Sequence, residues 1–280
     1  SKKLFFLALY GFFPQNIIFS SILLREALIQ FFFVYSLLFF TKWLMSNNRI
    51  NMFKTIFFVL LSSLFHPGMI ASLLVYGFMF LFLDVKKYSF NYSFKRKTLL
   101  VLFCGFTFAL IAYNISILNG KFSFLISDTN LSLLEKYESN SGIEEGGATY
   151  LRNYKINSIV DFLILMPLRL VYFVFSPMPY DVRGVGDLAA IILDSSFYYF
   201  LVYIIVRSRK IMNDNMFRIL PKIFFILFLT VSIGFALGTE NSGTAMRHRS
   251  KIFPALIIVV VFMESIKQNR RSIWNDKKID

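Results

Sequence analysis

Long apolar stretches, separated by short polar or basic segments, dominate the pattern of this 280-residue chain. A helix that crosses the hydrocarbon core of a bilayer needs about 20 mostly apolar residues, and most of the stretches approach that length. The run 52–83 is too long for one crossing, and His66-Pro67-Gly68 divides it because proline and glycine together break a helix. The pattern therefore predicts helices over 4–19 (interrupted by Pro14), 22–45, both parts of 52–83, 98–118, 156–176, 188–206, 219–237 and 253–266.

The composition indicates that these helices lie in a membrane. Hydrophobic residues make up 56% of the chain and 36 residues are Phe, which is more apolar surface than one soluble core can bury. The net charge of +14 is explained better by an uneven distribution across a bilayer than by nucleic acid. The single cysteine, Cys104, excludes an intrachain disulfide. We expect an all-α, polytopic transmembrane bundle that forms one domain over residues 1–280. Because the chain begins at Ser1 with a short apolar run, we also expect that upstream residues are missing.

The distribution of basic residues sets the expected topology, since cytoplasmic segments carry an excess of Lys and Arg. The polar, acidic segment 119–155 is expected outside, with a short helix on the membrane surface. The basic clusters can then all be cytoplasmic only if one of the two following apolar runs, 156–176 or 188–206, does not cross the membrane. We assign 156–187 to a re-entrant or interfacial segment, because Asp161 and Arg169 are costly in lipid and Pro167 breaks the run. With about eight spanning helices, the cytoplasmic side holds 20 Lys and Arg against 5 acids, and the outer side holds 10 against 11.

The segment 238–251, with the sequence GTENSGTAMRHRSK, joins a turn rich in glycine and hydroxyl groups to a basic cluster. An ordinary cytoplasmic anchor next to a helix would have a similar composition. The expected topology places the segment outside, against the charge rule, which favours a loop that binds an anion. Guanidinium groups bind phosphate in a bidentate manner, and a flexible backbone can approach it closely. The candidate ligands here are Thr244, Arg247, His248, Arg249 and Lys251.

Further unusual residues are expected on the same side. Arg25 and Glu26 interrupt an apolar stretch, and Glu26 shares a helix face with Gln30. Arg25 and Glu26 either form a structural ion pair, or the carboxylate of Glu26 faces a polar cavity and acts as a general base. His66 either belongs to a plain turn or adds a polar group at the membrane surface. Arg152 could close over a ligand as a lid, and Arg169 is a further candidate. The turn of Tyr180, Asp181 and Arg183 either stacks on a sugar or only connects two helices. Asp194 is either buried with a partner or faces the cavity.

Several other chemistries lack their motifs. Two histidines without an acidic cluster at ligand spacing argue against a dedicated zinc site. The chain has no phosphate-binding loop of the GxxxxGK[ST] type, no Rossmann fingerprint and no serine-nucleophile motif. These observations exclude an ATPase and a soluble dehydrogenase.

Three short motifs carry a family resemblance. They are Phe13-Pro14 followed by SSILLRE at 20–26, RLVYFVFSPMP at 169–179, and GTAMRHR at 243–249. On these motifs the chain resembles the Wzy-type O-antigen or exopolysaccharide repeat-unit polymerases, which are GT-C-like in broad architecture. In that family an aromatic residue, often Trp, follows the second proline, and Tyr180 keeps the aromatic character.

The resemblance implies transfer of a growing glycan from a polyprenyl-diphosphate carrier onto the next lipid-linked repeat unit, at the outer face of the bacterial cytoplasmic membrane. Arg247, His248 and Arg249 would neutralise the leaving diphosphate, and Glu26, or else Asp181, would accept the proton of the attacking hydroxyl. No cofactor is required because arginines supply the positive charge, and a divalent metal stays an open alternative. The expected partners are the bilayer, polyprenyl-diphosphate-linked glycans and a chain-length regulator, without nucleic acid. The substrate-binding residues would be Arg25, His66, Arg152, Arg169, Tyr180, Arg183, Thr244 and Lys251.

Three rival functions remain at this point. A flippase for lipid-linked oligosaccharides predicts paired halves and charges at mid-membrane, whereas this chain has no internal repeat and gathers its unusual charges on one side. A GT-C transferase or ligase that uses a polyprenyl-linked donor is harder to separate from a polymerase. A structural membrane subunit without chemistry is disfavoured by the clustered arginines.

Overall fold

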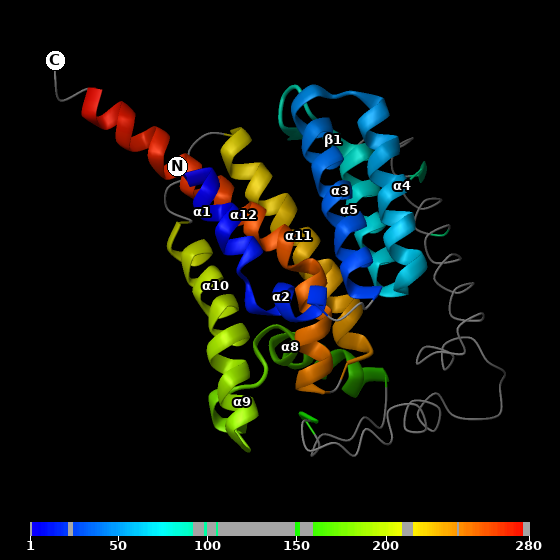
Figure 1. Ribbon diagram of the computed structural model, residues 1–280. Helices are drawn as coiled ribbons and strands as arrows, with labels where there is room; N and C mark the ends of the chain where they lie inside the picture. The colour runs from blue at the N-terminus through cyan, green and yellow to red at the C-terminus, as the bar shows by residue number, and fades with distance from the viewer. Residues whose placement is uncertain are drawn as a thin grey trace.

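The computed structural model describes residues 2–21, 25–91, 98–99, 105, 149–151, 159–208, 215–239 and 241–276, and these are almost entirely helical (Figure 1). The predicted all-α class is confirmed. The N-terminal part contains α1 (Lys2–Gly11), α2 (Pro14–Ser21), α3 (Arg25–Ser46), α4 (Arg49–Phe65), the 3-10 turn η1 (Pro67–Ile70), α5 (Ala71–Phe82) and a two-residue hairpin of β1 (Leu83–Asp84) and β2 (Ser89–Phe90).

The C-terminal part begins with α8 (Ile159–Phe175) and the 3-10 turn η3 (Pro179–Asp181). A second helical stretch consists of α9 (Val185–Ala190), one π-helical turn, η4 (Ile191–Ser195), and α10 (Ser196–Ser208). The last two helices are α11 (Asn215–Leu237) and the 35-residue α12 (Ser242–Asp276).

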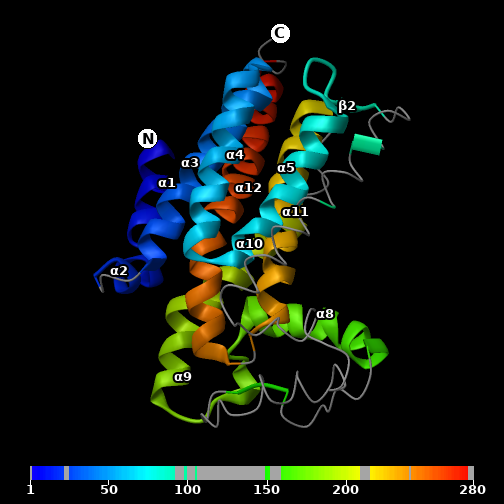
Figure 2. The same cartoon turned by 90° about the vertical axis from the view of Figure 1, so that its right-hand side faces the viewer.

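The long helices lie side by side and α8 crosses their end (Figure 2). α3 packs against α4, α11 packs against α12, and α12 also contacts α3, α8 and α10. The α3–α4 turn, the β1–β2 hairpin and the C-terminal end of α12 lie at one end of the helices, whereas α8 and the start of α12 lie at the other (Figures 1 and 2). Buried aromatic side chains fill the centre, including Phe40, Tyr76, Phe224 and Phe253.

Three described helical stretches are long and apolar enough to cross a membrane: Arg25–Ser46, Val185–Arg207 and Ile219–Leu237. Pro67–Phe82 and Ile164–Phe175 are shorter apolar helices. Their composition and exposed hydrophobic side chains are those of a membrane protein. The predicted runs 98–118 and 119–155 lie largely outside the described residues, as does Arg152, and so does the side chain of Asp161.

The predicted helix breaks at Pro14 and His66 are confirmed. α1 ends at Gly11 and α2 starts with Pro14 in its first turn, where a missing N–H costs nothing. His66 has an extended backbone, as a residue before proline prefers, and its Nδ1 accepts a hydrogen bond from the Gly68 N–H at 3.2 Å. A β-carbon on Gly68 would lie 2.8 Å from the ring of Phe235, so this close approach of η1 to α11 requires glycine.

Two sequence-based expectations about local structure are wrong. α8 continues through Pro167: the missing N–H and the ring clash of proline destabilise a helix, but Met166 and Leu170 on either side pack against the core. The segment 238–251 is not a flexible loop, since α12 begins at Ser242 and contains the whole basic cluster. Asn241 starts this helix: its side-chain oxygen accepts hydrogen bonds from the N–H groups of Gly243 at 2.8 Å and Thr244 at 3.4 Å.

Candidate functional site

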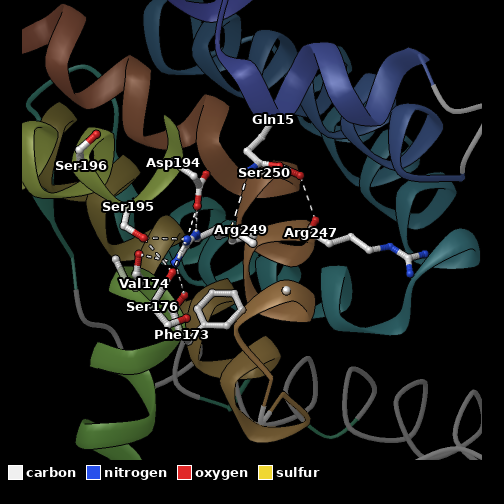
Figure 3. A network of polar contacts seen from close by, with 12 residues as sticks. Gln15, Phe173, Val174, Ser176, Asp194, Ser195, Ser196, Arg247, Arg249 and Ser250 are labelled. Carbon is white, nitrogen blue, oxygen red and sulfur yellow. Dashed lines mark hydrogen bonds and ion pairs between the residues drawn. The ribbon is translucent and has the colours of Figure 1, made fainter. Parts of the chain in front are cut away.

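The basic residues of the first turns of α12 point to opposite sides of the helix. Arg247 and Arg249 are two positions apart, which corresponds to about 200° of rotation around an α-helix. Figure 3 shows Arg249 directed toward Asp194 and Arg247 directed away from it. The helical structure therefore divides the predicted phosphate ligands into two groups.

The first group surrounds the carboxylate of Glu26 at the start of α3. Glu26 Oε1 accepts a hydrogen bond from Arg247 Nε at 2.7 Å and lies 2.5 Å from Arg247 Nη2. The ammonium of Lys251 is 3.6 Å from the same oxygen, and Arg25 Nε is 3.9 Å away. We call this group, together with the two histidines beside it, the cationic cluster: Arg25, Glu26, His66, Arg247, His248 and Lys251.

The two histidines extend the cationic cluster toward α11. The rings of His66 and His248 lie 4.8 Å apart, and both contact the ring of Phe235, at 4.8 and 4.9 Å. Lys251 Nζ lies 2.8 Å from His248 Nδ1. Burial, and then the positive charges nearby, lower the pKa of His66 to about 3. His66 is therefore a neutral imidazole at physiological pH, and it adds polarity without charge.

The cationic cluster has more positive than negative charge among the described residues. Three cations meet one carboxylate, and Glu26 is 2% exposed while the side chains of Arg25 and Arg247 are 58% and 37% exposed. The second oxygen of Glu26, Oε2, is buried without a hydrogen-bond partner in the described part of the chain. Such a cluster attracts an anion, because exposed guanidinium groups can still donate to one.

The second group is built around Arg249, which is 0% exposed. Its Nε donates to Asp194 Oδ2 at 2.6 Å and its Nη2 also binds this carboxylate. Nη1 donates to the carbonyl oxygens of Phe173 at 3.1 Å and Val174 at 3.0 Å, and Nη2 to that of Ser176 (Figure 3). These carbonyls belong to the C-terminal end of α8, where the helix itself leaves acceptors unused. Arg249 thus caps α8 with Nη1 and Nη2 while Nε and Nη2 bind Asp194.

A π-helical turn supplies the carboxylate for Arg249. η4 widens the helix between α9 and α10, and both Asp194 and Ser195 are buried there. Ser195 Oγ donates to the Ser176 carbonyl at 2.8 Å and accepts from Arg249 Nη2 at 3.2 Å. Turns of this kind are rare and often accompany functional sites. Of the two alternatives for Asp194, burial with a partner is confirmed. Ser176 and Ser195 were not anticipated, since a serine in an apolar run gives no sequence signal.

Arg169 has a similar capping role at another helix end. It is 5% exposed, and its Nη1 donates to the carbonyl of Leu237, the last residue of α11, at 3.4 Å. Its helix, α8, crosses the end of the bundle (Figure 2). Arg169, a candidate substrate ligand from the sequence, thus donates to a protein carbonyl.

The turn around Tyr180 forms a separate feature. Tyr180 and Arg183 are exposed and Asp181 is half-buried. The Tyr180 hydroxyl donates to that of Tyr172 at 3.3 Å, and Arg183 Nη2 donates to the Thr149 carbonyl at 3.1 Å. Thr244 lies in the first turn of α12, close to the bridge between Thr149 and Asn241.

Gln30 shares the face of Glu26, as the sequence predicts. Its Nε2 donates to Asn16 Oδ1 at 2.9 Å and to the Ser250 carbonyl at 3.3 Å. This contact ties α2 and α3 to α12 beside the cationic cluster. Asn16, which was not anticipated, also donates to the Tyr10 carbonyl at 2.8 Å.

Comparison of the chain with family models, with curated proteins and with solved structures finds no match. Within the described residues, no group of three or more His, Cys, Asp or Glu side chains has the arrangement of a metal site. The function must therefore be argued from the chemistry of the two groups and of the Tyr180 turn.

Proposed function

We propose that the chain is a membrane glycosyltransferase that polymerises polyprenyl-diphosphate-linked oligosaccharide repeat units into a surface polysaccharide. The observation that carries this proposal is the convergence of Arg25, Arg247 and Lys251 on one oxygen of Glu26, at the end of a bundle of apolar helices. A lipid diphosphate matches this arrangement, because its hydrocarbon chain fits among apolar helices while its charge meets cations at their ends.

Glycosyl transfer would use the cationic cluster as the electrostatic part of the site. The oxygen of an acceptor hydroxyl forms a bond to the anomeric carbon of the donor glycan. The bond from that carbon to the phosphate oxygen breaks, and its electron pair leaves with the polyprenyl diphosphate. Arg247, Arg25 and Lys251 stabilise the negative charge that develops on this leaving group. The donor is already activated, so no nucleotide sugar is consumed.

A carboxylate accepts the proton of the attacking hydroxyl in this proposal. Glu26 is the first candidate, because its Oε2 lies inside the cationic cluster and has no hydrogen-bond partner among the described residues. Asp181 is the alternative on the exposed turn. Burial raises the pKa of Asp181, partly offset by Arg183, and a raised pKa makes a carboxylate a better base near neutral pH.

The proposal assigns Arg249 a different task from the one suggested by the sequence. Its donors are all used by Asp194, Ser195 and the end of α8, so it positions α8 on α12 instead of contacting phosphate. His248 and Thr244 stay candidate substrate contacts beside Arg247. In this proposal the architecture is GT-C-like with about eight spanning helices, and the protein resides in a bacterial cytoplasmic membrane, where a chain-length regulator is a partner.

The test is a transfer reaction with the purified protein in nanodiscs. Lipid-linked oligosaccharides extracted from membranes of the source organism are the only substrate, and the products are resolved by size. A ladder of longer glycans is expected from the unaltered protein. R247A should abolish the ladder, whereas K222A removes an exposed charge near the start of α11 and should leave it unchanged.

Two further variants identify the base. Of E26Q and D181N, the substitution that removes the base should lower the rate by about 100-fold to 10,000-fold. Absence of a ladder, combined with movement of the lipid-linked substrate between the leaflets of a liposome, would show that the protein is a transporter and that the proposed chemistry is wrong.

A further inference from the structure

Three tyrosines before, within and after α8 form a connected series at the end of the bundle. Tyr150 stacks on Tyr172, with ring centroids 5.1 Å apart, and the hydroxyl of Tyr172 accepts from that of Tyr180 at 3.3 Å. The Tyr150 hydroxyl is fixed by the Thr239 carbonyl at 2.7 Å. We call this series the tyrosine shelf (Tyr150, Tyr172 and Tyr180).

The outermost ring of the tyrosine shelf is exposed but held in place. Tyr180 is 73% exposed. It follows Pro179, whose ring fixes the backbone, and the Asp181 N–H closes the turn onto the Met178 carbonyl at 2.9 Å. Met178 is buried, and its sulfur accepts a contact from the Tyr199 hydroxyl at 3.0 Å. A ring presented in this way loses little conformational entropy when a ligand stacks on it.

The turn that carries the exposed ring also carries charged side chains. Asp181 follows Tyr180 in sequence, and Arg183 is held between Thr149 and Asp187, with its backbone N–H donating to Asp187 Oδ2 at 3.0 Å. An exposed aromatic face in a turn that also carries a carboxylate and a guanidinium suits a sugar ring. The C–H groups of a sugar pack on the electron-rich face of the ring, and its hydroxyls bond to the charged groups.

The tyrosine shelf is connected to the cationic cluster by a short series of contacts. Phe173, next to Tyr172 in α8, stacks on Phe235 with centroids 6.1 Å apart. Phe235 in turn stacks on His248 at 4.9 Å. Thr239, which fixes Tyr150, lies just ahead of α12. Both features therefore belong to the same end of the molecule (Figure 2).

We propose that the tyrosine shelf is a carbohydrate-binding subsite that holds a saccharide ring of the glycan substrate by stacking on Tyr180. This inference rests on the proposed function for the identity of the glycan, but the binding itself does not require transfer. The shelf would orient the glycan while the cationic cluster binds the diphosphate.

The experiment separates glycan binding from diphosphate binding. Mild acid releases the lipid-free oligosaccharide from the same extracted lipid-linked substrate, and its affinity for the protein in nanodiscs is measured by calorimetry. Y180A should weaken this affinity at least about tenfold, and Y180W should retain it because the stacking face is kept. Binding of farnesyl diphosphate, a short lipid diphosphate without sugar, should be unchanged in Y180A and weakened at least about tenfold in R247A.

Other outcomes would overturn the inference. If the lipid-free oligosaccharide does not bind the unaltered protein, or binds Y180A equally well, the shelf is not a carbohydrate subsite. If Y180A only lowers thermal stability in nanodiscs, the ring is an anchor at the membrane surface. If glycan binding depends on Tyr180 but the transfer reaction gives no ladder, the carbohydrate subsite is supported and the polymerase proposal is wrong.

Discussion

Arg247 and Arg249 lie two residues apart on α12 and each binds a buried carboxylate, but their guanidinium groups differ in exposure and in the number of donors that are already used. Arg249 is fully buried, and each of its three nitrogens has an acceptor within the protein. Arg247 is 37% exposed and shares one carboxylate oxygen with Lys251 and Arg25. Its Nη1 has no hydrogen-bond partner among the described residues.

The difference shows how one basic motif can combine two tasks. A buried arginine that caps a helix end fixes structure, because leaving its partners unsatisfied would be costly. An arginine with spare donors beside a single carboxylate can bind an anion at little structural cost. Because positions two residues apart point to opposite sides of a helix, Arg249 can fix α12 against α8 while Arg247 binds the ligand.

Removal of Arg249 should have the largest effect on stability. R249A leaves Asp194 buried without its charge partner and uncovers the carbonyls at the end of α8, which should cost about 3–5 kcal/mol of unfolding free energy. Thermal and denaturant unfolding of the purified protein would measure the loss. R247A, two positions along, is the matched comparison and should cost less, because Lys251 and Arg25 stay beside Glu26. Equal losses in both variants would remove the distinction between the two sides of α12.

Removal of Arg247 should have the largest effect on anion binding. A hydrogen bond to a charged group contributes about 1.5–3 kcal/mol, so R247A should weaken farnesyl diphosphate binding by roughly 10-fold to 150-fold. R247K keeps the charge but loses the bidentate geometry, so its affinity for farnesyl diphosphate should lie between those of the unaltered protein and R247A. Calorimetry at one pH and one salt concentration gives the comparison. Unchanged affinity in R247A would show that the cationic cluster does not hold the anion.

Part of the local structure could be predicted from the sequence, although α8 continues through Pro167. Pro14 and His66-Pro67-Gly68 break helices through their own backbone geometry, so the breaks follow from residue type. The start of α12 had a readable signal as well, since Asn241 is a preferred N-cap residue. Helical spacing would then have separated Arg247 from Arg249.

The partners of the arginines could not be predicted in the same way. Arg249 bonds to Asp194, 55 positions away, and to Ser176, 73 positions away, while Arg247 reaches Glu26 across 221 positions. Such pairs depend on how α3, α8 and the π-helical turn pack on α12, which no local pattern specifies. The sequence indicated only that charged residues in apolar runs require partners.

Gly68 offers a way to disturb the contact between the histidines and α11 without removing a charge. In G68A the new β-carbon would lie 2.8 Å from the ring of Phe235, which is itself held by His66 and His248. Moving that ring should cost about 1–3 kcal/mol of stability and weaken farnesyl diphosphate binding by a few-fold. G11A is the control, because no atom lies within 4 Å of its new β-carbon. A G68A protein as stable as G11A would mean that the ring moves freely and does not fix the histidines.

The smallest expected effect is a pH dependence that belongs to the Arg247 side alone. Lys251 lies ahead of the apolar part of α12, and burial, only partly offset by the nearby carboxylate, lowers the pKa of its ammonium to about 7. The proton adds positive charge, so affinity for an anion should be highest below this pKa and fall as the pH rises from 6 to 8. The charged and titratable groups facing Lys251 are Glu26 and Arg25 on α3, His66 at η1, and Arg247 and His248 on α12.

The extracted lipid-linked oligosaccharide is the suitable ligand for this measurement, because the phosphates of a disubstituted diphosphate do not change charge in this range. We expect a several-fold loss of affinity between pH 6 and pH 8 in the unaltered protein. K251R stays charged throughout and should give a flat profile, since arginine does not deprotonate in proteins. If K251R keeps the pH dependence and H248Q removes it, the titrating group is the histidine and the assignment to Lys251 is wrong. A flat profile in K251R would show that the charge that changes with pH lies on the Glu26 side of α12, at Lys251. Arg249 lies on the opposite side and is paired with Asp194, so it would not change anion affinity over the same pH range.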